Sequence, residues 1–124
     1  MKATITSLIF LLLSLTVSSQ TYKYIGIEEG LSNQKIYKIQ KDARGYMWFL
    51  THVGIDQYNG KEIKHYKLRE GNRELDPLLN INWTFLDKTG TLLVTGKQGR
   101  IFRYDSGHDR FVQIYSMYNY WNKD

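Results

Sequence analysis

Two segments of the chain carry the same pattern of turn residues and apolar residues at a fixed spacing. The paired positions are Asp42 and Asp87, Gly45 and Gly90, and Gly54 and Gly99, each 45 residues apart, with Tyr58 and Tyr104 46 residues apart. A repeat of this length, built of short strand-like runs and glycine turns, is typical of a β-propeller blade. Because one blade cannot bury both of its faces, the function of such a chain belongs to an assembly of blades, and this chain holds only about two.

The first repeat, residues 35–67, divides into four strand-like runs separated by tight turns. The runs are residues 35–41, 46–51, 55–58 and 62–67. Asp42 and Gly45 delimit the first turn, because an aspartate can bond the backbone two residues on and a glycine adopts positive φ. Gly54 is expected to supply left-handed geometry in the second turn, and Asn59-Gly60 is a strong hairpin signal. We therefore predict one four-stranded antiparallel blade.

The second repeat, residues 81–116, follows the same plan less regularly. Its runs are residues 81–86, 92–95, 100–104 and 111–115, and the polar residues 69–80 link it to the first repeat. Trp48 of the first repeat becomes Leu93 in the second. In the first strands, Ile39 lies three residues before Asp42, but Phe85 lies two residues before Asp87. The sequence therefore does not fix the register of these strands. Residues 22–27 are a further candidate strand.

The amino-terminal residues have the layout of a secretory signal. Met1-Lys2 is positive, residues 5–17 are mostly apolar, and Val17-Ser18-Ser19 offers small residues before Gln20. This layout predicts a signal peptide over residues 1–19 and export to the periplasm; a buried core helix or an uncleaved anchor is the alternative. The fold class predicted for the whole chain is all-β: two four-stranded antiparallel propeller blades in residues 20–124, forming an incomplete propeller preceded by a signal-peptide helix.

Composition excludes several classes of protein. The chain has no cysteine, which excludes disulfide scaffolds, thiol catalysis, cysteine-ligated zinc and a lipoprotein anchor. The net charge of +5 comes from scattered lysines and arginines. A nucleic-acid interface needs clustered basic residues, so we expect no nucleic-acid partner.

No set of residues has the spacing of a catalytic or metal site. The three histidines, His52, His65 and His108, fall in a hairpin link, an outer strand and a loop. Two pairs of neighbouring carboxylates, Glu28 with Glu29 and Asp105 with Asp109, are interpreted as solvated turn residues rather than a glycosidase pair. We predict no catalytic residue, no metal and no cofactor, and the ligand-binding residues remain unassigned.

The three tryptophans are the side chains best suited to stacking on sugar rings. Trp48 lies in a strand of the buried type, so core packing is the favoured interpretation. The sequence context of Trp83 does not decide between core packing and stacking on a sugar. Trp121, in the aromatic carboxy-terminal tail, is the most plausible exposed ring.

The first repeat resembles a known family repeat. Its spaced residues are Gly30-Leu31-Ser32-Asn33, Ile36, Ile39, Asp42, Gly45, Trp48, Thr51, Gly54, Tyr58 and Gly60. This pattern closely resembles the two-component regulator propeller repeat, strongly over residues 22–67 and more weakly over 78–116. The sequence departs from the repeat at Leu50, where the family favours glycine, and mildly at Gln34 and Ile55.

The resemblance implies a sensor. In that family, tandem repeats build large periplasmic propellers that form the input half of hybrid histidine kinases, followed by a transmembrane helix and cytoplasmic kinase, receiver and DNA-binding domains. Many such sensors respond to oligosaccharides. The chain is therefore expected to be an amino-terminal fragment of such a sensor. Its partners would be the remaining blades or further copies of itself, an oligosaccharide would bind the complete sensor, and any membrane contact would lie in the missing downstream part.

Two other classes of function stay open. Some propellers with a similar repeat are lyases or hydrolases, so the chain could be a fragment of a propeller enzyme. It could also be a small secreted assembly or adhesion module that completes its ring by oligomerising. The sequence of the gene downstream of codon 124 would separate a fragment from a stand-alone module.

Overall fold

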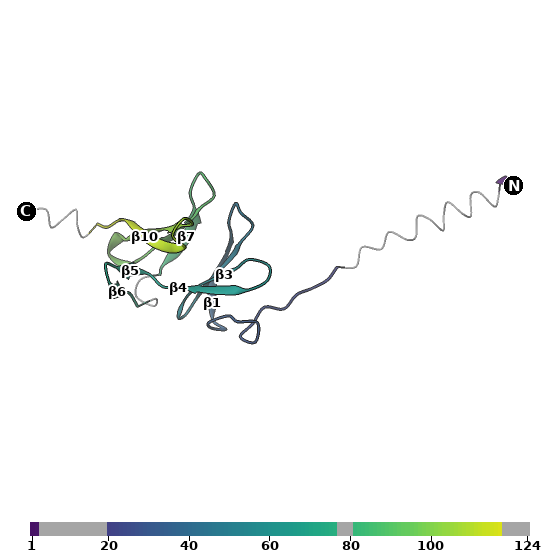
Figure 1. The fold of residues 1–124 in the computed structure, drawn as a ribbon, viewed down its shortest axis with the longest axis horizontal. Helices are drawn as coiled ribbons and strands as arrows, with labels where there is room; N and C mark the ends of the chain where they lie inside the picture. The colour runs from purple at the N-terminus through teal and green to yellow at the C-terminus, as the bar shows by residue number, and fades with distance from the viewer. Residues whose placement is uncertain (3–19, 77–80, 118–124) are drawn as a thin grey trace, which may run out of the picture.

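The computed structural model describes residues 1–2, 20–76 and 81–117. Of the predicted signal segment, only Met1 and Lys2 are among the described residues. Trp121 lies outside them. Within the described part, two four-stranded antiparallel sheets stand next to each other, with a small two-stranded hairpin between them in the chain (Figure 1). The predicted fold class, two antiparallel propeller blades, is confirmed.

The first blade consists of β1 (Ile36–Lys41), β2 (Met47–Thr51), β3 (Gly54–Tyr58) and β4 (Ile63–Tyr66), in that order across the sheet. The predicted Asp-to-Gly turn connects β1 to β2, and Gly45 has a φ of +85°. Gly54 also has a positive φ, of +157°, as predicted. A Cβ at Gly54 would lie 3.1 Å from the Tyr66 carbonyl oxygen, so close backbone approach is a second reason for the glycine there.

The second blade consists of β7 (Trp83–Leu86), β8 (Leu92–Thr95), β9 (Ile101–Asp105) and β10 (Arg110–Tyr115), with a one-turn 3-10 helix η1 (Lys97–Gly99) in the β8–β9 link. The polar link between the blades contains a feature that its sequence did not predict. There β5 (Arg69–Glu70) and β6 (Arg73–Glu74) pair, and each arginine lies opposite a glutamate. The candidate strand at residues 22–27 has no strand structure.

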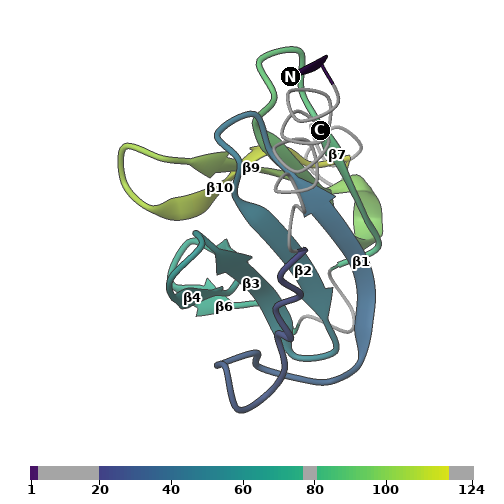
Figure 2. The same cartoon turned by 90° about the vertical axis from the view of Figure 1, so that its right-hand side faces the viewer.

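The core fills the space between the two sheets. The first blade contributes one face of β2 and β3, and the second contributes the facing side of β8 to β10; the buried side chains include Trp48, Leu50, Ile55, Tyr66, Leu92, Val94, Phe102, Tyr104 and Phe111. Strand alternation explains this set, since neighbouring residues point to opposite faces. Figure 2 shows the four strands of the first blade side by side, with the second blade crossing above them.

The turns of the two repeats meet at the interface between the blades. The Ala43 amide donates to the Gly90 carbonyl oxygen at 3.1 Å. A Cβ placed on Gly90 would lie 2.2 Å from the Cβ of Ala43, whereas a Cβ on Gly45 would meet nothing within 4 Å. The second repeat therefore needs its glycine for close packing as well as for positive φ.

The Gly-Leu-Ser motif that precedes β1 is fixed to the face of the first blade that points away from the second. Leu31 is buried. The Ser32 amide and hydroxyl both donate to Asp56 Oδ2, at 2.7 and 2.8 Å. Asp56 is fully buried and also contacts His65 Nδ1 at 2.8 Å, so its carboxylate holds the motif against the sheet.

The outer face of the second blade carries the buried Leu93 and two partly exposed apolar side chains, Phe85 and Val112. Phe85 lies opposite Leu93, and Leu93 and Val112 lie opposite Arg103, so all four point to the same side. Phe85 and Val112 are 40% and 37% exposed. Leu93 occupies the position that Trp48 occupies in the first blade, where the equivalent face is covered by the second blade.

Candidate functional site

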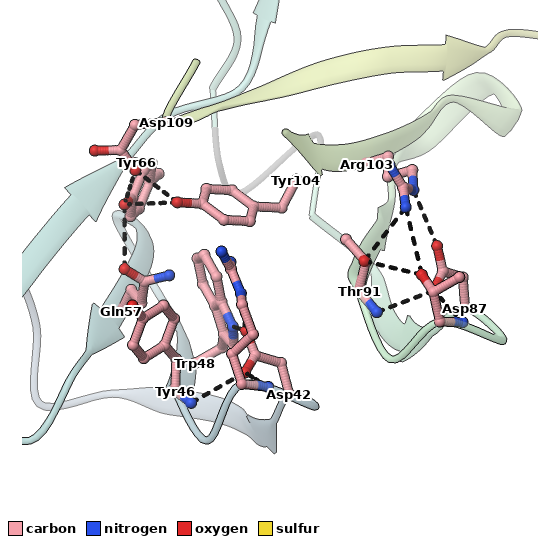
Figure 3. A network of polar contacts seen from close by, with 12 residues as sticks. Asp42, Tyr46, Trp48, Gln57, Tyr66, Asp87, Thr91, Arg103, Tyr104 and Asp109 are labelled. Atoms are coloured by element: carbon pink, nitrogen blue, oxygen red, sulfur yellow. Dashed lines mark hydrogen bonds and ion pairs between the residues drawn. The ribbon is translucent and has the colours of Figure 1, made fainter. Parts of the chain in front are cut away.

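The Asp42 carboxylate organises the first blade at its edge. Its Oδ1 accepts hydrogen bonds from the amides of Arg44 and Tyr46 at 2.9 and 3.0 Å. Its Oδ2 accepts the indole N–H of Trp48 at 2.9 Å (Figure 3). Asp42 is only 7% exposed, so these donors compensate for its burial. The predicted turn role of Asp42 is correct, and the bond to Trp48 adds a link to the core.

The second repeat keeps this carboxylate but changes its donor. Asp87 Oδ1 accepts the amides of Thr89 and Thr91 at 2.8 and 2.9 Å, and its Oδ2 accepts Arg103 Nε at 2.9 Å. The bonds from Thr89, Thr91 and Arg103 hold the pKa of Asp87 below its usual range. Arg103 lies opposite Leu93, as Gln57 lies opposite Trp48. Where the tryptophan is lost, an arginine on the neighbouring strand supplies the missing donor.

Asp109 forms the polar centre of the contact between the blades. The hydroxyls of Tyr66 and Tyr104 both donate to its Oδ1 at 2.6 Å (Figure 3). Lys64 Nζ lies 3.0 Å from its Oδ2. These donors lower the pKa of Asp109 to about 2, and burial together with the bond to Asp109 raises the pKa of Tyr66. Asp109 is therefore a structural contact, and its interpretation as a solvated turn residue is incomplete.

Aromatic rings surround this polar centre. Trp48 lies 4.7 Å from the Tyr104 ring and 5.7 Å from the Phe111 ring, both edge-on. Tyr66 packs edge-on against Tyr104 and Phe111 at 5.6 and 5.8 Å. Edge-to-face pairs at these distances are favourable. Trp48 is a core residue, as its sequence context predicted, and offers no face to a ligand.

The remaining candidate residues lie apart from one another. Each histidine bonds a different partner: His52 Nδ1 contacts the Tyr37 hydroxyl at 2.6 Å, His65 contacts Asp56, and His108 Nδ1 contacts Asp105 at 2.7 Å. No group of three potential metal ligands occurs within residues 1–2, 20–76 and 81–117. Glu29 accepts the Gly26 amide at 2.7 Å, and Glu28 is exposed.

A pocket of about 480 Å³ opens between the first strands of the two blades. Its lining comes from β1, the end of β2 and the start of β7, and we call it the β1–β7 pocket; the lining residues are Tyr37, Lys38, Leu50, Thr51, Ile81, Asn82 and Trp83. Trp83 is 61% exposed and Tyr37 is 56% exposed. Trp83, whose role the sequence context did not decide, therefore lies at a concave surface.

The electrostatic character of the β1–β7 pocket is positive. Lys38 Nζ lies 3.9 Å from the centre of the Trp83 ring and donates to the Thr84 carbonyl oxygen at 2.5 Å. Lys35 Nζ lies 5.4 Å from the centre of the Tyr37 ring. No aspartate or glutamate is among the described residues that line this pocket. A flat ring, an amide and an ammonium group thus share one surface.

A second hollow, of about 580 Å³, lies at the outer strands β4 and β10. Some charged side chains of its lining form ion pairs with residues outside the lining. Lys67 pairs with Glu74, which lies outside the lining, and Glu70 pairs with Arg73 and Arg100. Acidic and basic side chains line this hollow together, whereas no acidic side chain is among the described residues that line the β1–β7 pocket.

Two neighbouring four-stranded blades define a propeller-type domain, and comparison with known proteins shows which family part of the first blade resembles. The model of the family described as two component regulator propeller matches residues 30–52. The predicted resemblance is thereby confirmed for that segment, which runs from the Gly-Leu-Ser motif to the end of β2. No curated protein matches the chain.

A solved structure supports the fold. The extracellular domain of the one component system BT4673 from B. thetaiotaomicron matches with a TM-score of 0.58 at 24% sequence identity. The match covers 82% of this chain and 14% of that domain. This chain therefore corresponds to a small part of that much longer structure. Among the residues that the structure describes, no helix is long and apolar enough to cross a membrane.

Proposed function

We propose that the chain forms part of the periplasmic input domain of a hybrid two-component regulator, that it recognises an oligosaccharide and that it performs no catalysis of its own. The family repeat at residues 30–52 supports a regulatory role. The similar fold belongs to the extracellular domain of a one component system, which supports a location outside the cytoplasm for this chain as well. Since the match covers only 14% of that domain, the remaining blades are the first expected partners.

The observation that carries the proposal is the exposed Trp83 ring in the β1–β7 pocket. Sugars present flat C–H faces that pack on aromatic rings, while amide and hydroxyl groups fix their orientation. The pocket supplies both kinds of group, through Trp83 and Tyr37 and through Asn82. Carboxylate pairs, which glycosidases use, do not line this pocket among the described residues.

Export is part of the proposal. A signal peptide over residues 1–19 would deliver the chain to the periplasm, where oligosaccharides released from polysaccharides are found. Amino-terminal sequencing of the periplasmic protein should begin at Gln20. Recovery of the intact amino terminus in the cytosol would contradict this part of the proposal.

The experiment that tests recognition is a binding screen of the full chain against an array of oligosaccharides. We expect at least one oligosaccharide to bind and to remain uncleaved after prolonged incubation. Trp83→Ala should abolish the binding, while Phe85→Ala, on the same strand but outside the pocket, should leave it unchanged. Release of shortened products would favour the propeller-enzyme alternative, and absence of binding to every oligosaccharide would refute the proposal.

A further inference from the structure

We infer that the β1–β7 pocket selects an anionic oligosaccharide, with the ammonium group of Lys38 receiving the acidic group of the sugar next to the Trp83 ring. This inference rests on the proposed function and specifies the chemical class of its ligand. It follows from where the positive charges of the first blade lie and from what surrounds them.

Lys38 carries a charge that no carboxylate balances among the described residues. Two basic side chains elsewhere in the blades do have such a partner: Lys64 lies 3.0 Å from Asp109, and Arg103 lies 2.9 Å from Asp87. The contacts of Lys38 are a backbone carbonyl oxygen and an aromatic ring, both neutral. Since Lys38 is half-buried, its charge is only partly compensated by water.

The surroundings reinforce this charge. A second cation, Lys35, lies outside the lining, with its Nζ 5.4 Å from the centre of the Tyr37 ring, which is part of the lining. The described lining contains one ammonium group and no acidic side chain. A low-dielectric wall of aromatic and aliphatic groups strengthens the attraction of a cation for an anion. The pocket therefore favours a ligand with a negative group over a neutral ligand of the same shape.

The position of Lys38 relative to Trp83 explains why the ligand should be a sugar acid rather than a small inorganic anion. The ammonium nitrogen lies 3.9 Å from the ring centre, so a group that contacts the nitrogen is held beside the ring. An apolar ring face contributes little to binding a bare anion, but it packs well on a pyranose ring that carries one. An ammonium group binds a carboxylate or a sulfate ester equally well, because lysine acts as a compact point charge.

The test compares matched acidic and neutral oligosaccharides by calorimetric titration of the full chain. The probes are trigalacturonate, its methyl ester, a sulfated carrageenan tetrasaccharide and the desulfated form of that tetrasaccharide. We expect at least one acidic probe to bind at least about tenfold more tightly than its neutral counterpart, which is the size of one charge-assisted hydrogen bond. The acidic probe that binds identifies the carboxylate or the sulfate as the recognised group.

Variants on a single strand separate a specific role of Lys38 from a general effect of charge. Lys38→Gln should weaken binding of the acidic probe at least about tenfold. Lys38→Arg should retain most of it, because the charge stays. Lys41→Gln removes the same charge from an exposed position of β1 and should leave the affinity unchanged. Thermal melts of all variants check that the blades remain folded.

The outcomes distinguish this inference from the proposed function. Equal affinity for acidic and neutral forms, with binding lost in Trp83→Ala, would overturn the anionic selectivity and leave oligosaccharide recognition standing. Unchanged affinity of folded Lys38→Gln would also overturn the inference. Failure of all four probes would overturn it as well, and the proposed function would then depend on the wider array of neutral oligosaccharides.

Discussion

The contact between the two turns leads to a prediction that compares equivalent glycines. Gly45 and Gly90 occupy the same place in the two repeats and have similar φ angles of +85° and +75°. Their surroundings differ, because an added Cβ would be free at Gly45 but would lie 2.2 Å from the Ala43 Cβ at Gly90. The difference between the two alanine substitutions therefore measures the packing of one blade on the other.

The size of the effect follows from the two contributions. Gly45→Ala adds only the strain of an alanine in the left-handed region and should cost about 1–2 kcal/mol of unfolding free energy. Gly90→Ala adds the same strain and an overpacked contact, which typically costs about 1–3 kcal/mol more. The expected loss for Gly90→Ala is thus about 2–5 kcal/mol.

Removing the opposing methyl group should rescue the variant. In Ala43→Gly/Gly90→Ala the two Cβ atoms no longer collide, and the loss should shrink towards that of Gly45→Ala. Urea unfolding followed by far-ultraviolet circular dichroism, at low protein concentration, gives the four free energies of this double-mutant cycle. Equal losses for Gly45→Ala and Gly90→Ala, or a coupling energy near zero, would show that the turns do not pack as described.

Three further predictions concern the interface and the exposed faces. Trp48→Leu should destabilise the chain by about 3 kcal/mol, and adding Gln57→Arg should recover about 1–2 kcal/mol by restoring a donor to the buried carboxylate; the same arginine in the wild-type background, where the tryptophan leaves no room, should destabilise. Because the pKa of Asp109 is lowered to about 2 in the folded chain, its stabilising contribution is complete above about pH 4 and is lost as the pH falls towards 2. The difference in unfolding midpoint between wild type and Asp109→Asn should accordingly vanish in acid, and a difference independent of pH would refute this. Sedimentation of the isolated chain should show self-association through its uncovered sheet faces, whereas a monodisperse monomer that unfolds cooperatively would contradict the expectation.

The repeat made the arrangement of strands predictable. Turn residues at a constant spacing fix where each strand must end, and all eight blade strands lie where their apolar runs placed them. The small hairpin of β5 and β6 escaped prediction because its strands are two residues long and polar, so they show no alternation. The positive φ of Gly54 was predicted correctly, but the close approach of the Tyr66 carbonyl oxygen was not, because Tyr66 lies on another strand.

The candidate site was less accessible from sequence. Trp48 could be assigned to the core because its neighbours are apolar, and it is fully buried. Trp83 lies in a strand with one buried and one exposed face. Only the packing of the two blades shows which of these faces is exposed. The role of Asp109 also depends on contacts with Tyr66, 43 residues away. Residues whose function comes from packing between repeats leave no local signal.

The turn aspartate takes its donor from Trp48 in the first blade and from Arg103, on another strand, in the second. This difference affects how blades with a weakly matching sequence can be found. A blade keeps its geometry as long as one side chain offers an N–H to the second carboxylate oxygen, and that side chain need not stay on the same strand. Selection can then erase the most recognisable residue of the repeat while the acceptor persists. A search built on the tryptophan will pass over such blades, whereas a pattern that requires the aspartate, the turn glycine and a donor at either of two positions will retrieve them. Counts of blades in proteins of this architecture should rise accordingly.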